Sequence, residues 1–296
     1  MKFLYLGEGA KKWDAVYRDS KHSNGTTGSE MDLIMSHIKN FLQVFGNSNG
    51  INLIDLGCGN GLPAIDIIKA IQAQNLSVNY VAVDLSQEML QLATNNIEKE
   101  LPGISITRLQ LDFESDSLAS RLLDLKQNSK RPNLLINLGN TLGNYVNVSS
   151  VLTNFLQSMT LDDYIIIGNG LINDQNPQKI LAAYDGVESV KDAVTAPAKS
   201  LGLFTDQDDY RVLWNATERR VEFRIKLNGD RQLSLAEQSV EIENGDEILI
   251  AQSRKYTEAS LTKLLSGVGF RTELLTTNRN RSYILAMVQP TRYSAS

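Results

Sequence analysis

The sequence is poor in residues that bind metals or form disulfide bridges. Its 296 residues include one cysteine, Cys58, and two histidines, His22 and His37. Neither a disulfide framework nor a zinc site of cysteine and histidine ligands can be assembled from so few residues, and we expect no metal centre. Because a single cysteine suits a reducing compartment, the sequence predicts a cytoplasmic location.

Long apolar runs and blocks of positive charge are also lacking. No stretch reaches the roughly 20 apolar residues of a membrane-spanning helix, and the apolar run before Glu8 is too short for a signal peptide. The 29 basic and 34 acidic residues give a formal net charge of -5 and are mixed along the chain. Since nucleic-acid binding requires a basic patch that neutralises phosphates, we expect neither a nucleic-acid partner nor a membrane partner.

Hydrophobic residues make up 42% of the chain, enough to bury a sizeable core. From about residue 50 to 175, short β-branched runs alternate with helical patterns, which indicates a parallel sheet covered by helices. The predicted strands are 51–56, 79–84, 104–110, 133–138 and 163–168, and the predicted helices are 62–74, 87–100, 115–126 and 148–158.

Near residue 205 the alternation gives way to a series of strand-like runs. Asn228-Gly229 and Asn244-Gly245 favour the positive φ angles of tight hairpin turns, so we expect an antiparallel segment here. A helix at 258–267 and two further strands then return to the first pattern. The predicted fold is α/β, a doubly wound sheet of residues 48–175 and 257–290 with a smaller α+β lobe of residues 1–47 and 176–256 over its catalytic edge.

A glycine-rich turn follows the first predicted strand. The segment Gly57-Cys58-Gly59-Asn60-Gly61 precedes a helix, so the backbone can approach a ligand closely at the carboxyl end of the strand. A dinucleotide-binding loop would space its glycines G-x-G-x-x-G, whereas the spacing from Asp55 is D-x-G-x-G-x-G. This spacing resembles the first motif of class I S-adenosylmethionine-dependent methyltransferases, whose cofactor has no pyrophosphate.

Acidic residues stand at the ends of the next two strands. The carboxylate of Asp84 can accept hydrogen bonds from both hydroxyls of a ribose, and the resemblance implies that Asp112 holds the adenine amino group while Phe113 packs on the ring. Each feature alone is typical of a turn or cap, but together they favour a cofactor site. The predicted S-adenosylmethionine site comprises Asp55, Gly57, Cys58, Gly59, Gly61, Asp84, Leu85, Asp112, Phe113 and Asn137.

The methyl acceptor must be inferred from the site, because the fold fixes only the donor. The fourth predicted strand runs into GNTLGN (139–144) and has no N-P-P-Y motif, which argues against exocyclic amines of bases. This segment, the loop INDQNPQKILAAYD (172–185) and the sequence SRKY (253–256) resemble the histidine-specific methyltransferases of the ergothioneine pathway and their fungal relatives that N-methylate prenylated tryptophan. The resemblance covers most of the chain beyond residue 50.

The resemblance implies roles for three polar residues. Asn144 would hold the α-amino and carboxylate ends of an amino acid, Tyr184 would contact the amino acid backbone, and Ser253 would contact the side chain. We expect Asn144 and Tyr184 to act in catalysis by orienting the amine, not as acid or base. Proton loss through water would suffice, because a nearby sulfonium and a poorly solvated pocket both lower the pKa of an ammonium.

Two departures from the family concern the substrate. Where the histidine enzymes carry an acid two residues before the serine, this chain has Ala251, which weakens histidine recognition by about 1 to 3 kcal/mol and leaves room. We therefore expect an aromatic amino acid, either histidine or a larger one such as tryptophan or a derivative. A shifted acid, Glu247 or Glu258, is the alternative. The N-terminal stretch HSNGTTGSE (22–30) keeps Glu30 but lacks the family's tyrosines.

Other interpretations remain open from the sequence. Another small-molecule N- or O-methyltransferase of class I would share the cofactor motifs, and a non-catalytic protein could use them only to bind S-adenosylmethionine. A nicotinamide oxidoreductase would also place a glycine loop after the first strand. Trp13, Trp214 and Tyr256 are expected in the core, and the oligomeric state is left open.

Overall fold

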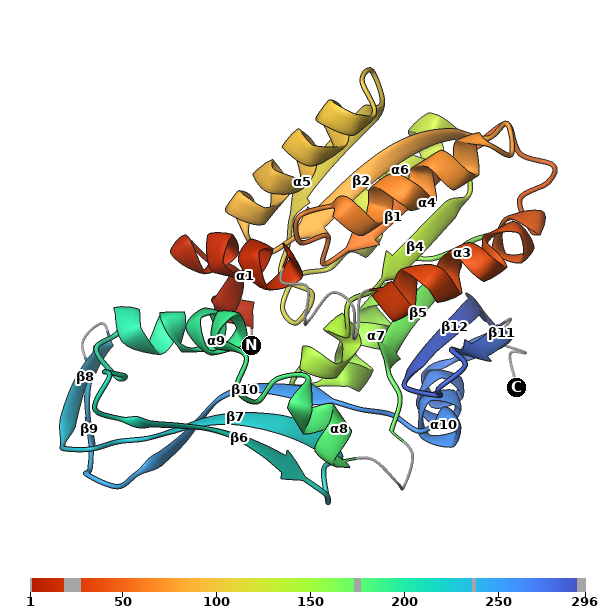
Figure 1. The fold of residues 1–296 in the computed structure, drawn as a ribbon. Helices are drawn as coiled ribbons and strands as arrows, with labels where there is room; N and C mark the ends of the chain where they lie inside the picture. The colour runs from red at the N-terminus through yellow and green to blue at the C-terminus, as the bar shows by residue number, and fades with distance from the viewer. Residues whose placement is uncertain (1, 19–27, 173–176, 236–237, 292–296) are drawn as a thin grey trace.

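The computed structural model describes residues 2–18, 28–172, 177–235 and 238–291, and its centre is a seven-stranded sheet (Figure 1). In spatial order the strands are β11 (Phe270–Thr277), β12 (Tyr283–Pro290), β5 (Tyr164–Gly170), β4 (Asn133–Asn137), β1 (Gly50–Leu56), β2 (Ser77–Asp84) and β3 (Ser105–Gln110). This strand order confirms the predicted fold class, an α/β protein with a doubly wound sheet.

Strands β1 to β5 are parallel, whereas β12 runs antiparallel to β5, and β11 antiparallel to β12. Every residue of β1 and β4 is buried, as expected for central parallel strands covered on both faces. The order of the strands reverses between β1 and β4. In such sheets the loops at the carboxyl ends of these two strands diverge, and ligands bind in the crevice between them.

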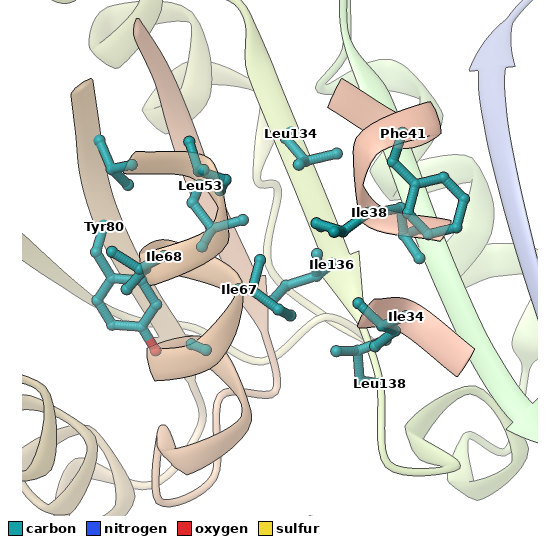
Figure 2. Packing of buried hydrophobic residues seen from close by; sticks show 14 of the residues in the cluster. Ile34, Ile38, Phe41, Leu53, Ile67, Ile68, Tyr80, Leu134, Ile136 and Leu138 are labelled. Carbon is teal, nitrogen blue, oxygen red and sulfur yellow. The ribbon is translucent and has the colours of Figure 1, made fainter. Parts of the chain in front are cut away.

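Helices cover both faces of the sheet (Figure 1). One face carries α3 (Gly28–Gln43), α4 (Leu62–Gln72) and α5 (Gln87–Glu100), and the other carries α6 (Ala119–Ser129), α7 (Val148–Gln157) and α10 (Glu258–Val268). Figure 2 shows how the first face packs, with side chains of α3 and α4 meeting those of the central strands. The labelled residues of this cluster are Ile34, Ile38, Phe41, Leu53, Ile67, Ile68, Tyr80, Leu134, Ile136 and Leu138.

Local sequence explains where two of these helices begin. The Ser86 side chain accepts a hydrogen bond from the backbone N of Met89 at 3.2 Å, so the predicted start of α5 is confirmed. Helix α10 follows a capping box between Thr257 and Ser260. Helix α6 begins later than predicted, because the backbone after Asp112 first forms a turn in which Asp116 N donates to the Asp112 carbonyl.

A second, antiparallel sheet lies beyond the carboxyl ends of the parallel strands (Figure 1). It contains β6 (Asp209–Asn215), β7 (Arg220–Lys226) and β10 (Glu247–Arg254), in the order β10-β7-β6. Its apolar side chains pack with η1 (Lys2–Tyr5), α1 (Glu8–Arg18), α9 (Glu188–Ser200) and the segment that follows α8 (Pro177–Ala182).

The N-terminal region divides differently from the prediction. Residues 1–47 were expected to belong to the smaller lobe, but α3 packs on the central sheet, against β12 and α4. Its buried Ile34, Ile38 and Phe41 recur at intervals of three or four residues and form one apolar stripe. Of the N-terminal elements that the structure describes, η1 and α1 pack with α9 of the smaller lobe. The remaining boundaries of the two units stay a prediction.

The two Asn-Gly dipeptides were also interpreted wrongly. They do not close hairpins, because β8 (Arg231–Leu235) and β9 (Gln238–Ile242) form a separate ribbon inserted between the paired strands β7 and β10. The dipeptides face each other at the base of this ribbon, where Gly229 N donates to Asn244 Oδ1 at 2.8 Å. Gly229 and Gly245 do adopt positive φ angles, of 108° and 90°.

Within the described residues, no helix is long and apolar enough to cross a membrane. The same residues contain no group of three or more histidine, cysteine, aspartate or glutamate side chains arranged to hold a metal ion.

Candidate active site

The glycine-rich loop leaves β1 in left-handed backbone conformations. The φ angle is 77° at Gly57, 52° at Gly59 and 72° at Gly61, a region that residues with a Cβ rarely adopt. A Cβ at Gly61 would also lie 2.9 Å from the Cα atom of Ala93, so this glycine permits α4 and α5 to pack closely. Gly57 and Gly59 line a cavity at the carboxyl edge of the sheet, which we call the loop cavity; Gly61 does not line it.

Asp84, at the end of β2, directs its carboxylate toward the glycine loop. Oδ2 accepts a hydrogen bond from Gly59 N at 3.2 Å, and Oδ1 accepts one from Ser86 N at 3.0 Å. Burial raises the pKa of Asp84 to about 6, although these backbone hydrogen bonds act in the opposite direction. The carboxylate lines the loop cavity beside Leu85 and can accept hydrogen bonds from the hydroxyl groups of a ligand.

Asp55 and Asn137 support the loop from the strands beneath it. Asp55 accepts a hydrogen bond from Tyr80 Oη at 2.8 Å, and burial raises its pKa to about 7. Asn137 Nδ2 donates to the Leu56 carbonyl at 2.9 Å, which ties the end of β4 to the end of β1. Asn137 does not line the loop cavity, and its buried Oδ1 has no hydrogen-bond partner among the described residues.

The connection after β3 supplies an apolar slot. The ring of Phe113 packs edge-on against Phe155, with centroids 5.3 Å apart, and against Tyr145 at 6.3 Å. Asp112 lies at the same wall, and Met89 of α5 also lines it. The structure brings most of the predicted cofactor residues to the loop cavity; they are Asp55, Gly57, Cys58, Gly59, Asp84, Leu85, Asp112 and Phe113.

These groups suit S-adenosylmethionine. The carboxylate of Asp84 can hold two neighbouring hydroxyls of a ribose, and Met89, Leu111 and Phe113 offer apolar surface against which an adenine ring can pack. The backbone at Gly57 and Gly59 is free of side chains where the methionine end would lie.

The N-terminal elements η1 and α1 contribute aromatic residues that sequence reasoning missed. Tyr5, Trp13 and Tyr17 all line the loop cavity, and Trp13 contacts the edge of Tyr5 with centroids 5.2 Å apart. Helix α1 is held over the glycine loop because Asn60 Nδ2 donates to Asp14 Oδ1 at 2.8 Å. The expectation that Trp13 lies in the core was therefore wrong.

The other two aromatic residues expected in the core do not line the loop cavity. Tyr256 is buried in the apolar cluster beneath α7 and α10, and Trp214 packs against the cluster of the smaller lobe. Residues 19–27, including His22, lie outside the described part.

A second cavity, which we call the lobe cavity, adjoins the first. Trp13, Gly139 and Asn144 line both cavities, and Asn140, Tyr184, Val190, Val194, Phe223 and Ser253 complete the lobe cavity. Asn144 ends the 3-10 helix η3 (Thr141–Asn144), which follows β4. Its buried Oδ1 has no hydrogen-bond partner among the described residues, so it can accept one from a ligand.

Tyr184 and Ser253, which come from distant parts of the chain, meet at a buried lysine. Lys255 Nζ donates to Tyr184 Oη at 2.9 Å and to Ser253 Oγ at 3.0 Å. The side chain of Tyr184 also packs edge-on against Phe223, with centroids 5.5 Å apart. The structure therefore brings together Asn144, Tyr184 and Ser253, the residues expected to contact a substrate, and adds Lys255, to which the sequence analysis assigned no role.

Ala251 is 3% exposed and lies among the apolar residues of the smaller lobe. It pairs with Phe223 across β7 and does not line the lobe cavity itself. The alternative acids lie elsewhere, because Glu247 forms an ion pair with Arg211 at 3.4 Å and Glu258 pairs with Arg281. Among the described residues, no acidic side chain lines the lobe cavity.

Glu30 is a buried carboxylate behind the GNTLGN segment. Its two oxygens lie 3.0 and 3.1 Å from Gly139 N, which donates to them, and Oε1 also accepts a hydrogen bond from Tyr283 Oη. Burial raises the pKa of Glu30 to about 7 against the lowering effect of these hydrogen bonds. Glu30 thus ties α3 to the segment that carries Asn144.

The chain is similar in sequence to two named N-methyltransferases. The chain is 22% identical over 279 residues to the histidine N-alpha-methyltransferase of Mycobacterium tuberculosis, covering 90% of this chain and 83% of that one. It is 24% identical over 312 residues to the 4-dimethylallyltryptophan N-methyltransferase of Claviceps fusiformis, covering 95% and 85% of the two chains.

Among solved structures, magnesium protoporphyrin IX methyltransferase of Synechocystis, with S-adenosylhomocysteine bound, has a TM-score of 0.53 and 14% identity over 98% of both chains. This likeness shows that the fold is shared. The model of the family described as histidine-specific methyltransferase, SAM-dependent, matches residues 1–290. The chain therefore belongs to the family of histidine-specific methyltransferases and is an enzyme that takes its methyl group from S-adenosylmethionine.

Proposed function

We propose that this enzyme methylates the α-amino group of an amino acid with a large aromatic side chain, such as tryptophan or a derivative. The observation that carries the proposal is the lobe cavity, which shares Asn144 with the loop cavity and is lined by Trp13, Phe223 and two valines. Among the described residues the lining contains no acidic side chain, and its apolar part suits the larger and less polar indole ring better than imidazole, whose two nitrogens both need polar partners.

The two similar enzymes support an amino acid substrate. One is named for histidine and the other for a prenylated tryptophan, and both names specify N-methylation. The apolar lining of the lobe cavity favours the second kind of substrate. The single free cysteine, Cys58, and the acidic net charge support the further expectations of a cytoplasmic location and a substrate other than a nucleic acid.

Bound S-adenosylmethionine supplies a methyl group on a positively charged sulfur, which is open to attack by an amine lone pair. The Asp84 carboxylate, the Phe113 ring and the backbone of the glycine loop would hold the cofactor. Asn144 lies where the two cavities meet, so its unpartnered Oδ1 would accept an N–H of the substrate amine and direct the lone pair toward the loop cavity. A neutral amide does this without placing a negative charge beside the sulfur.

The substrate ammonium must lose a proton before it can react. No aspartate, glutamate or histidine of the described residues lines the lobe cavity to accept this proton directly. A poorly solvated site lowers the pKa of an ammonium, because burial disfavours the charged form. Water can then take the proton, and catalysis consists mainly of positioning the amine.

The proposal is tested by mass spectrometry of products. The enzyme is incubated with S-adenosylmethionine and a panel of the twenty amino acids, 4-dimethylallyltryptophan, simple phenols and simple carboxylic acids. We expect an α-N-methylated aromatic amino acid. The Asp84→Ala variant, which we expect to bind S-adenosylmethionine poorly, serves as the control. Methylated phenols or acids with no methylated amino acid would show a different methyltransferase, and binding of S-adenosylhomocysteine without any product would show a non-catalytic protein.

A further inference from the structure

Lys255 is a buried cation without a counter-charge. The residue is only 4% exposed, and it forms no ion pair with an acidic residue of the described part of the chain. Its ammonium instead donates to the hydroxyls of Tyr184 and Ser253 and lies 5.2 Å from the centre of the Tyr184 ring. Lys126, which is also largely buried, behaves differently and pairs with Asp163 at 2.8 Å.

The space for this lysine is provided by the fold. A Cβ at Gly170, in β5, would lie 2.9 Å from Lys255 Cδ and 3.0 Å from Asn140 Oδ1, so only glycine lets the two side chains approach here. The backbone N of Lys255 is fixed by a hydrogen bond to the Arg219 carbonyl at 2.8 Å. The lysine is thus held beside residues that line the lobe cavity.

A buried charge is costly unless an opposite charge or several hydrogen bonds compensate for it. Two hydroxyl oxygens and the face of an aromatic ring compensate for the ammonium of Lys255 only in part. An anion that enters with the substrate would complete this compensation. Every α-amino acid brings such an anion, its α-carboxylate.

The lobe cavity has both polar and apolar lining residues. We refer to Asn140, Asn144 and Ser253 as its polar wall, and to Phe223 and the two valines of α9 as its apolar wall. Because the Ser253 hydroxyl oxygen accepts a hydrogen from Lys255, its own hydrogen must be donated in another direction. A carboxylate at the polar wall would accept that hydrogen and lie close to the ammonium.

The sequence of β10 agrees with this polarity. Ala251, Ser253 and Lys255 alternate along an extended strand and its continuation, so they lie on one face. Ala251 packs with the apolar cluster that includes Phe223, and Lys255 lies at the other end. A bound amino acid would therefore lie along this strand, with its side chain toward Ala251 and its carboxylate toward Lys255.

We infer that Lys255 supplies the positive charge by which the enzyme selects substrates with a free α-carboxylate, acting as a positioning residue through Ser253. The inference rests on the proposed amino acid substrate. It makes the carboxylate, and not only the aromatic ring, a determinant of specificity. An aromatic amine that lacks the carboxylate would leave the charge of Lys255 uncompensated.

The test compares tryptophan with tryptamine, which differ only in the carboxylate, and, if histidine is the better substrate, histidine with histamine. Initial rates give kcat and KM for the wild-type enzyme and for Lys255→Met. We expect the wild-type enzyme to prefer the amino acid by about 30-fold or more in kcat/KM, because losing one partner of a buried charge pair has an effect of that size. In Lys255→Met the KM for the amino acid rises by a similar factor, and the amine is affected far less.

Lys191→Met is the matched control, because Lys191 of α9 is a partly exposed lysine of the same lobe and its loss changes the net charge equally. It should keep the wild-type preference. A wild-type enzyme that methylates tryptamine as well as tryptophan overturns the inference without any variant. An equal loss on both substrates in Lys255→Met overturns it too, while the proposed function stands. If the wild-type enzyme gives no methylated amino acid, the proposed function fails as well.

Discussion

Glu30 makes the stability of the protein depend on pH in a direction opposite to that of an ordinary surface carboxylate. Burial raises its pKa from 4.5 to about 7 in the folded protein. The folded state therefore holds this proton more tightly than the unfolded state, and the stabilisation is fully present below pH 4.5. It is lost as the pH rises toward 7, and a shift of this size corresponds to about 3 kcal/mol.

The variant Glu30→Gln isolates this contribution. Its amide oxygen can still accept a hydrogen bond from Gly139 N or Tyr283 Oη, as the protonated carboxyl does, but it carries no charge at any pH. We expect the variant to resemble the wild-type protein near pH 5 and to exceed its free energy of unfolding by up to about 3 kcal/mol near pH 8. Urea unfolding without ligand, followed by circular dichroism at several pH values, measures the difference.

Other carboxylates define the background of this experiment. Burial raises the pKa of Asp55 to about 7 and that of Asp84 to about 6, so the wild-type and variant proteins should both lose some stability above pH 5. Asp208 and Glu222 have lowered pKa values and titrate below this range. Glu8→Gln, at an exposed position of α1, is the control. A Glu30→Gln effect that is the same at pH 5 and pH 8 would refute the reasoning.

Three further predictions concern the site. Asp84→Asn should weaken binding of S-adenosylhomocysteine by about 10- to 100-fold, because the amide cannot accept two hydroxyl hydrogens; calorimetry showing unchanged affinity would contradict this role. Asn144→Ala should lower kcat/KM by about 10- to 100-fold with little change in the affinity for S-adenosylhomocysteine; a loss confined to cofactor binding would show that Asn144 holds the cofactor and not the substrate. Ala251→Glu should raise the kcat/KM ratio of histidine to tryptophan by about tenfold or more, because a larger side chain behind Phe223 would move that ring into the lobe cavity and leave less room for an indole; competition between the two amino acids measures this ratio, and an unchanged ratio would show that residue 251 does not determine specificity.

The sheet and the loop cavity could be predicted because their signals are local. The parallel strands are short, largely apolar runs, and a side chain assigned to the site stands at or just beyond the carboxyl end of several of them, as Asp84 does for β2. The order of such strands in space follows from few topological rules. The glycine spacing after β1 identified the cofactor loop for the same reason, since Gly57 and Gly59 need left-handed backbone conformations.

The rest depends on how distant segments pack. The apolar stripe of α3 says that the helix is buried, but not against which sheet, so its place on the core was missed. Trp13 reaches both cavities only because α1 is held over the glycine loop through Asp14 and Asn60. The ribbon at β8 and β9 was missed because an Asn-Gly pair favours a turn without specifying which strands it joins.

Ala251 shows how the structure changes an argument from sequence. From the sequence it is the missing acid of a histidine site, and the expected result is a roomier pocket. In the structure it is buried in the wall behind the cavity, against Phe223, so its small size sets where that ring can lie. A larger residue at position 251 would push Phe223 into the lobe cavity before it reached the substrate. The aromatic preference therefore depends on Ala251 and Phe223 as a pair, and Phe223→Ala should relax it even with Ala251 unchanged.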